Sequence, residues 1–366
     1  MKLVIFGLSV SSSWGNGHAT LWRGLCNALA KRGHRVVFLE RDVPYYASTR
    51  DLFELPGGEL ILYRDWTEVL LPAQRHLADS DVALVTSYCP DAIAATALAL
   101  DSAVRLRVFY DLDTLVTLTR IAAGNEVEYV GPRGLADFDL VLSYTGGSSL
   151  DELRTLLGAR LVAPLYGSVN PSIHKPVPPD SRYRADLGYL GTFARDRNAM
   201  LHALFVEPAR RLPNRKFVLA GAMYDDQFPW QPNIFFVRHL PPAEHASFYC
   251  STRLTLNVTR RAMARMGYCP SGRLFEATAC GAAVLSDAWE GLDQFFEPAS
   301  EILLAGNAEE AMAALERSPQ ELARIAAAGR ERTLREHTAD ARAVQLEEIL
   351  DRACGHRVNV TAGEAS

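Results

Sequence analysis

A single acidic residue interrupts an otherwise apolar helical segment in the second half of the chain. The stretch 268–287, YCPSGRLFEATACGAAVLSD, predicts a helix over 273–280 that contains Glu276, followed by Gly281 and a buried strand. A carboxylate among apolar neighbours is unfavourable unless a charged or hydrogen-bonding group compensates it. That group is either a protein side chain, with Arg273 as the nearest candidate in sequence, or a ligand.

Cationic side chains and glycines follow the first predicted strand of the same half. In GYLGTFARDRNAML, Gly191 and Thr192 end the strand, and Arg195 and Arg197 lead into a helix. Backbone amides and guanidinium groups are what binds a diphosphate. A helix dipole contributes only about 0.3–1 kcal/mol near the surface, so the arginines should supply most of the affinity. The alternative is a surface loop with solvated arginines.

The start of the helix that carries Glu276 has the same character. Ser271 and Gly272 would present free backbone amides there, and Arg273 adds another guanidinium group. Two basic helix starts in one half of the chain favour a single anionic ligand over two coincidences.

In the first half, His18 lies at the start of a predicted helix, after a polar loop that follows the first strand. The loop lacks the GxGxxG pattern, so a dinucleotide fingerprint is absent. The positive end of a helix disfavours an imidazolium ion, which would leave His18 neutral and able to act as a base. The alternative is an ordinary histidine in a glycine-containing turn.

Asp111 and Asp113 follow another predicted strand, 106–110. One interpretation is a carboxylate that orients His18 and stabilises its cation, as in a hydrolase triad. Another is a helix N-cap, with Asp113 preceding Thr114. Asp-x-Asp is also a familiar metal-binding pattern of nucleotide-sugar enzymes with one Rossmann-like domain, but two such domains are expected here, and we predict no metal site.

Short apolar runs alternate with helical patterns and predict how these residues are positioned. A series of buried strands separated by helices indicates a parallel sheet covered on both faces. The first half contains strands at 3–6, 36–40, 81–86, 106–110 and 139–144, with helices at 19–32, 91–100 and 149–157. After a proline-rich stretch the second half has strands at 187–191, 216–221, 234–238, 254–258 and 301–305, with helices at 197–211, 242–250, 308–316 and 319–336.

The predicted fold class is therefore α/β, with two Rossmann-like domains facing a cleft. The expected domains are an N-terminal domain over 1–165, a proline-rich linker over 166–182, a C-terminal domain over 183–338 and a final helix over 339–354 that packs on the first domain.

Composition excludes several classes of function. The 366 residues carry a net charge of −5 without a basic block, which argues against nucleic acid as a partner. The six cysteines form no CxxC pair and match neither a zinc site nor a disulfide framework. The apolar N-terminal run is too short for a membrane span or a signal peptide, so we expect a cytoplasmic protein without an integral membrane segment.

Four segments together carry a family resemblance: YDLDTLVTL, PLYGSVNPSIHKP, GYLGTFARDR and SGRLFEATACG. In this order they resemble the CgeB-like (spore-maturation type) glycosyltransferases, which have the GT-B fold. The resemblance implies that the second domain binds a nucleotide-sugar donor and that Glu276 accepts hydrogen bonds from the ribose hydroxyls. It also implies that neither a metal nor a separate cofactor is needed, because protein cations stabilise the departing diphosphate.

One position departs from the wider GT-B pattern. Many retaining members carry a second glutamate eight residues before the ribose-binding one, where this chain has Tyr268. The GNGH loop instead resembles that of inverting members, in which the histidine deprotonates the acceptor. The resemblance thus implies inversion, with His18 as the base and Asp111 or Asp113 as its partner.

The predicted function is transfer of a sugar from a nucleoside-diphosphate sugar to an acceptor hydroxyl. Donor-binding residues would be Ser271, Gly272, Arg273 and Glu276, with Gly191, Thr192, Arg195 and Arg197. The alternatives are a sugar-nucleotide epimerase or hydrolase, or a non-catalytic relative that binds nucleotide sugars. The acceptor stays open: a glycan, a lipid-linked sugar, a small molecule or a protein.

Overall fold

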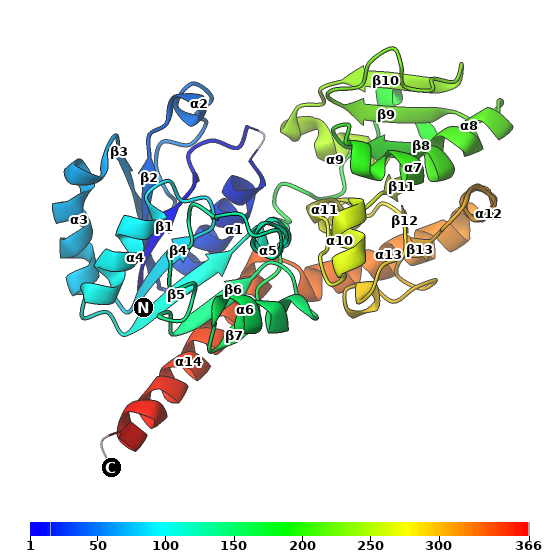
Figure 1. Ribbon diagram of the computed structural model, residues 1–366. Coiled ribbons are helices and arrows are strands. Elements are labelled where there is room, and N and C mark those ends of the chain that lie inside the picture. The colour runs from blue at the N-terminus through cyan, green and yellow to red at the C-terminus, as the bar shows by residue number, and fades with distance from the viewer. Residues whose placement is uncertain (15, 365–366) are drawn as a thin grey trace. The chain divides into compact units, whose positions relative to one another are not determined.

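The computed structural model describes residues 1–14 and 16–364. The chain divides into two compact units. The first comprises Met1–Gly167 together with the C-terminal segment from Ala339, and the second comprises Ser168–Thr338. Each unit contains one parallel sheet with helices packed on it (Figure 1).

The first unit contains a seven-stranded sheet in which all neighbouring strands run parallel, in the order β3-β2-β1-β4-β5-β6-β7. The strands are β1 (Lys2–Gly7), β2 (Arg35–Arg41), β3 (Gly58–Tyr63), β4 (Val82–Thr86), β5 (Leu106–Asp111), β6 (Leu140–Ser143) and β7 (Val162–Pro164). The helices are α1 (Gly17–Lys31), α2 (Pro44–Ala47), α3 (Trp66–Ala78), α4 (Ala92–Asp101), α5 (Thr114–Ala122), α6 (Ser149–Leu157) and α14 (Ala339–Glu364).

The two faces of this sheet bury different helices. Leu3 and Ile5 of β1 point to the face covered by α1 and α14, where Trp22 and Leu346 join the same core cluster. Phe6 points to the opposite face because side chains alternate along a strand, and it packs on Trp66 at the start of α3. Every strand of the centre is therefore buried on both sides, as the continuous apolar runs predict.

The second unit contains a six-stranded sheet, again all parallel, in the order β10-β9-β8-β11-β12-β13. The strands are β8 (Ala185–Leu190), β9 (Phe217–Gly221), β10 (Ile234–Arg238), β11 (Thr252–Asn257), β12 (Val284–Ser286) and β13 (Leu303–Leu304). The helices are α7 (Asn198–Leu201), α8 (Glu207–Arg211), α9 (His245–Ser251), α10 (Arg261–Met266), α11 (Gly272–Ala279), α12 (Ala308–Leu315) and α13 (Pro319–Glu336).

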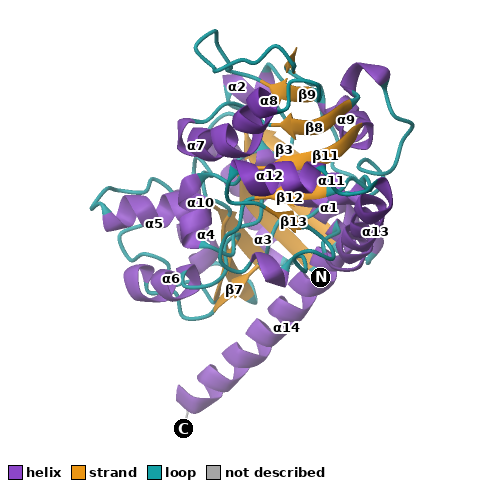
Figure 2. Ribbon diagram, turned by 90° about the vertical axis from the view of Figure 1, so that its right-hand side faces the viewer, coloured by secondary structure: helices purple, strands orange, loops and turns teal. Residues whose placement is uncertain are grey.

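A π-helical turn over His202–Val206 joins α7 to α8, so the predicted helix 197–211 is one continuous element with a local bulge. Figure 2 shows this element and α9 on opposite sides of the second sheet. The core on the first side gathers Tyr189, Leu256, Phe205 and Leu315.

The predicted α/β class with two Rossmann-like sheets is confirmed. The elements that were not predicted include α2, β3, α3 and β7. Strand β7 ends in Pro164, at the beginning of the proline-rich stretch. The following segment is bound to the second unit: the Val169 amide donates to the His337 carbonyl, and the Asp180 amide donates to Ser251 Oγ.

Helix α14 belongs to the first unit, where it packs against α1. Over the part of the chain that the structure describes, no helix combines the length and the apolar character that crossing a membrane requires.

Candidate functional site

The two sheets share one strand order around their first strand, and that order locates the candidate sites. In an open parallel sheet, ligands bind beyond the carboxyl ends of the strands, where the strand order reverses. This point lies between β1 and β4 in the first unit and between β8 and β11 in the second.

In the first unit, His18 is the second residue of α1 and lies beside Asp113. Asn16 caps the helix by accepting a hydrogen bond from the His18 amide at 3.1 Å. His18 Nε2 lies 2.8 Å from Asp113 Oδ2, and its Nδ1 is buried without a hydrogen-bond partner among the described atoms. This contact fixes a proton on Nε2 and leaves the lone pair of the neutral ring on Nδ1.

Asp113, rather than Asp111, is therefore the carboxylate next to His18. Ser87 Oγ also donates to Asp113 Oδ2, at 3.1 Å. Asp111 is fully buried at the end of β5, where its Oδ1 accepts the Asp113 amide, and burial raises the pKa of its carboxyl to about 7. Asp113 does occupy the N-cap position of α5, as the alternative predicts, but its side chain makes no capping hydrogen bond to the helix.

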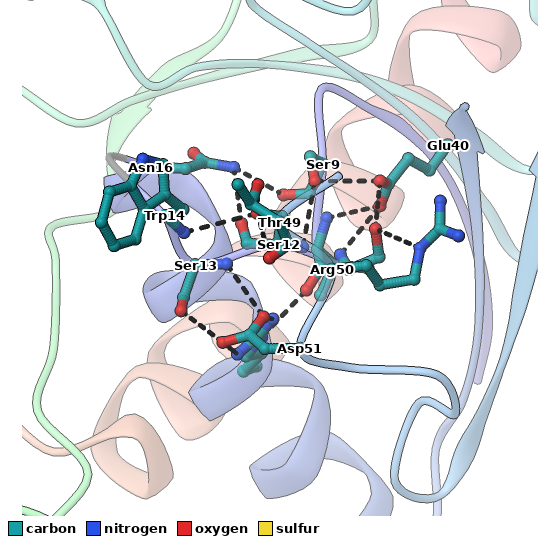
Figure 3. Close-up of polar contacts among 12 residues, drawn as sticks. Ser9, Ser12, Ser13, Trp14, Asn16, Glu40, Thr49, Arg50 and Asp51 are labelled. Atoms are coloured by element: carbon teal, nitrogen blue, oxygen red, sulfur yellow. Dashed lines mark hydrogen bonds and ion pairs between the residues drawn. The ribbon is translucent and has the colours of Figure 1, made fainter. Parts of the chain in front are cut away.

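Glu40, which the sequence analysis did not single out, holds the loop that leads to His18 (Figure 3). Its carboxylate is fully buried at the end of β2 and accepts four hydrogen bonds from that loop. The donors are the hydroxyls of Ser9 and Ser11 and the amides of Val10 and Ser11, at 2.5–2.9 Å. A buried carboxylate with this many donors is compensated without a cation.

In the second unit, Arg273 lies over the carboxyl ends of β8 and β11. Its Nη1 donates to Asn257 Oδ1 at 2.9 Å, and its guanidinium carbon lies 5.3 Å from the centroid of the Tyr189 ring. A Cβ at Gly191 would fall 2.7 Å from Arg273 Nη2. Glycine after β8 thus leaves the guanidinium group of Arg273 in place, which a larger residue would displace.

Arg197 joins this group through Tyr189, whose hydroxyl oxygen accepts a hydrogen bond from Arg197 Nη1 at 3.0 Å. Its Nε is buried and has no hydrogen-bond partner among the described atoms. Arg195 and Thr192, predicted for the same site, are exposed in the connection between β8 and α7. Two of the three predicted arginines, Arg197 and Arg273, therefore meet at one tyrosine.

Glu276 lies one turn after Arg273 on α11, but no ion pair joins the two among the described residues. Its Oε2 accepts a hydrogen bond from Tyr249 Oη at 3.2 Å. Burial raises the pKa of Tyr249 well above its usual range, so this hydroxyl stays protonated and donates. The buried salt bridge that the sequence left open is not formed, and neutral groups hold both charged side chains.

The remaining predicted residues shape the start of α11. Ser271 is the N-cap residue of α11, in extended conformation and without a side-chain capping bond. Gly272 lies close to Glu276, since a Cβ added at Gly272 would be 3.9 Å from Glu276 Oε1. Tyr268 adopts a positive φ of 45°, and its amide donates to the Glu290 carbonyl. Strained backbone of this kind is common next to functional sites.

One family model matches part of the chain, mostly within the second unit. Residues 195–348 match the family described as "Glycosyl transferase-like". The match includes Arg195, Arg197, Arg273 and Glu276. A search of curated protein sequences finds no match.

Solved structures resemble the whole chain at low identity. Sucrose-phosphate synthase from Thermosynechococcus elongatus is 15% identical with a TM-score of 0.66, covering 96% of this chain and 99% of its own. Anabaena HepE in complex with UDP-glucose is 14% identical, also with a TM-score of 0.66, over 96% and 100% of the two chains. Starch synthase IV of Arabidopsis thaliana, bound to ADP and acarbose, is 11% identical with a TM-score of 0.65 over 97% and 99%. The chain therefore has the two-domain GT-B glycosyltransferase fold.

Proposed function

We propose that this protein is a glycosyltransferase that moves a sugar from a nucleoside-diphosphate sugar to an acceptor hydroxyl, with inversion and without a metal in the transfer step. The observation that carries the proposal is the separation of Arg273 from Glu276. Residues three apart lie on the same face of a helix and ordinarily pair when oppositely charged. Here each is held by a neutral partner, Asn257 or Tyr249.

A ligand with both an anionic and a hydroxyl-bearing part fits such a pair of uncompensated charges. A nucleoside diphosphate has both, because its phosphates suit guanidinium groups and its ribose hydroxyls can donate to a carboxylate. Arg273 and Arg197 would bind the diphosphate with the amides of Gly191 and Gly272, and Glu276 would bind the ribose. As the bond to the sugar breaks, the same cations stabilise the charge growing on the diphosphate.

His18 is the proposed base for the acceptor. The imidazole would remove the proton of the attacking hydroxyl, and Asp113 would stabilise the imidazolium ion that forms. Asp111 has no direct role in this scheme, since burial favours its protonated form near neutral pH. The CgeB-like subfamily stays a prediction from the resemblance, which names neither the sugar nor the acceptor.

The matched family and the nucleotide-bound neighbours support donor binding more directly than they support transfer. HepE binds UDP-glucose and starch synthase IV binds ADP, as their structures record. An epimerase or hydrolase would use the same donor without an acceptor, and a non-catalytic relative would bind it only. The His18–Asp113 pair favours the transferase, because a binding protein needs no base.

The testing experiment is a thermal-shift series with nucleoside diphosphates and nucleotide sugars. A ligand at about 100 times its Kd stabilises the protein by about 2.7 kcal/mol, which raises the melting temperature measurably. We expect a rise with one class of nucleotide and its loss in Glu276→Ala. The matched control is Glu331→Ala, which removes an exposed glutamate on α13 and should keep the full shift.

The absence of a shift with every nucleotide would contradict donor binding. With a donor identified, nucleoside diphosphate release is compared with and without candidate acceptors. Release that depends on an acceptor supports transfer, whereas full release in water alone would identify a hydrolase.

A further inference from the structure

Three metal-ligating side chains converge in the second unit, from segments far apart in sequence. They are His174, in the segment before β8, His245, the first residue of α9, and Glu276 of α11. One ligand atom of each lies within 4.8 Å of the other two. Neither histidine was predicted as a site residue. His174 lies in the segment PLYGSVNPSIHKP, which served only for the family resemblance, and His245 lies in none of the four segments that carry it.

His174 lacks the hydrogen bond that a buried imidazole normally forms. The residue is 8% exposed, and its Nε2 is buried without a partner among the described atoms. Buried polar atoms are nearly always satisfied, so an unsatisfied one needs an explanation. A ligand that accepts the nitrogen lone pair supplies it.

The other two side chains are oriented by neighbours, as metal ligands usually are. His245 makes a hydrogen bond with the Leu240 backbone, which fixes one ring nitrogen. Tyr249 Oη donates to Oε2 of Glu276. Metal-binding histidines and carboxylates typically have such second hydrogen-bond partners, which set the tautomer and the direction of the lone pair.

We propose that His174, His245 and Glu276 form a binding site for a divalent transition metal of the zinc class. Two imidazoles and one carboxylate, with a fourth position for water, are a ligand set that Zn²⁺ accepts. With bonds of about 2.0–2.2 Å, the ligand atoms of a tetrahedral site lie about 3.4 Å apart. The three ligand atoms, at most 4.8 Å apart in this structure, must therefore move closer together when a metal binds.

One neighbouring charge weakens the proposed site. Arg273, one helical turn from Glu276, opposes the cation electrostatically. The site should thus be weaker than a structural zinc site, and reversible binding is expected.

The metal site does not depend on the proposed function, but the two share Glu276. A bound metal would occupy the carboxylate assigned to ribose, and metal and nucleotide would then compete. The proposed metal takes no part in the transfer of the sugar.

The experiment is equilibrium binding of Zn²⁺ to the metal-free, tag-free full chain without nucleotide, by isothermal titration calorimetry. We expect one Zn²⁺ per chain. His174→Gln and His245→Gln should each weaken binding by more than about 100-fold, since even the groups that orient metal ligands contribute 10- to 100-fold. His202→Gln, which removes an exposed histidine of the same unit, should bind as the wild type does.

Co²⁺ provides a second readout, because its visible spectrum reports the coordination number and nitrogen ligation. A tetrahedral spectrum that disappears in His174→Gln supports the site. Failure of the wild type to bind Zn²⁺, or equal binding by His174→Gln with unchanged melting temperature, would overturn it. The nucleotide-dependent thermal shift of the metal-free protein is measured separately, so failure here leaves donor binding unaffected.

Discussion

The first and second units use one sheet topology to hold opposite charges at the carboxyl end of their first strand. After β1, the loop is held by the buried carboxylate of Glu40, and it leads to a histidine paired with Asp113. After β8, the backbone turns at Gly191 beneath Arg273, and Arg197 bonds to Tyr189. The first arrangement suits the transfer of a proton, and the second suits binding of an anion.

The difference teaches that the fold supplies a position, while the residues there determine the chemistry. In both units the strand order reverses beside the first strand. In the first unit, the carboxylate of Glu40 accepts hydrogen bonds from the loop after β1, and the carboxylate of Asp113 pairs with His18. In the second, the side chains of Arg197 and Arg273 have only neutral hydrogen-bond partners among the described residues, Tyr189 and Asn257, so their charge remains available.

The strongest test of this comparison is His18→Asn. Loss of a general base is expected to lower the rate of sugar transfer about 10²- to 10⁴-fold, whereas nucleotide binding by the second unit should persist. Steady-state rates with the identified donor and acceptor measure the first effect, and the thermal shift measures the second. His202→Asn is the control. A variant that keeps most of its activity would remove the assigned role of the first unit.

Asp111→Asn tests whether the buried Asp111 carboxyl retains its proton in the folded protein. Its pKa rises from 3.8 to about 7, so between these pH values the folded protein retains a proton that the unfolded chain has released. Stability of the wild type should therefore fall as pH rises from about 4 to about 7. The stability of the Asn variant should not fall in this way, because its side chain does not ionise. Above pH 7 the variant should therefore be more stable than the wild type, by up to about 4 kcal/mol.

Urea denaturation across this pH range measures that difference. Asp101→Asn, an exposed change on α4, serves as the control and should shift the profile little. If the difference in free energy of unfolding between the wild type and Asp111→Asn does not change with pH, Asp111 is ionised throughout this pH range.

Arg273→Met tests the second unit with a smaller expected effect. Hydrogen bonds to charged groups contribute about 1.5–3 kcal/mol, so nucleotide affinity should fall by about 10- to 100-fold. Isothermal titration calorimetry with the nucleoside diphosphate that the thermal-shift series identifies measures this change. Arg324→Met, an exposed substitution on α13, is the matched control. Unchanged affinity would place the anion elsewhere.

Periodicity predicted most of the fold, and the failures have physical causes. Apolar runs located the central strands because these are buried on both faces. Strand β3 was missed because it lies at the edge of the sheet and is half exposed, with the pattern GELILY. Strand β7 was missed because Pro164 suggested a linker, although a proline is tolerated in an edge strand.

The candidate site was predicted less completely, since its geometry depends on side-chain direction. The sequence could not choose between Asp111 and Asp113, because they are two residues apart at the end of one strand. Tyr189 and Asn257 could not be predicted as site residues, because each belongs to a strand whose sequence is typical of a buried core. Glu40 left one usable signal, an acidic residue at the end of the apolar run VVFLE.

The return of α14 to the first unit has a consequence for synthesis on the ribosome. Ala343, Leu346 and Leu350 complete the same core cluster as Trp22 and Leu25, yet they are translated after the entire second unit. The nascent first unit therefore exposes an apolar helix surface while Ser168–Thr338 emerges and can fold by itself. Domains often fold in order from the N-terminus, but here the first unit is completed by a helix that is translated after the second unit.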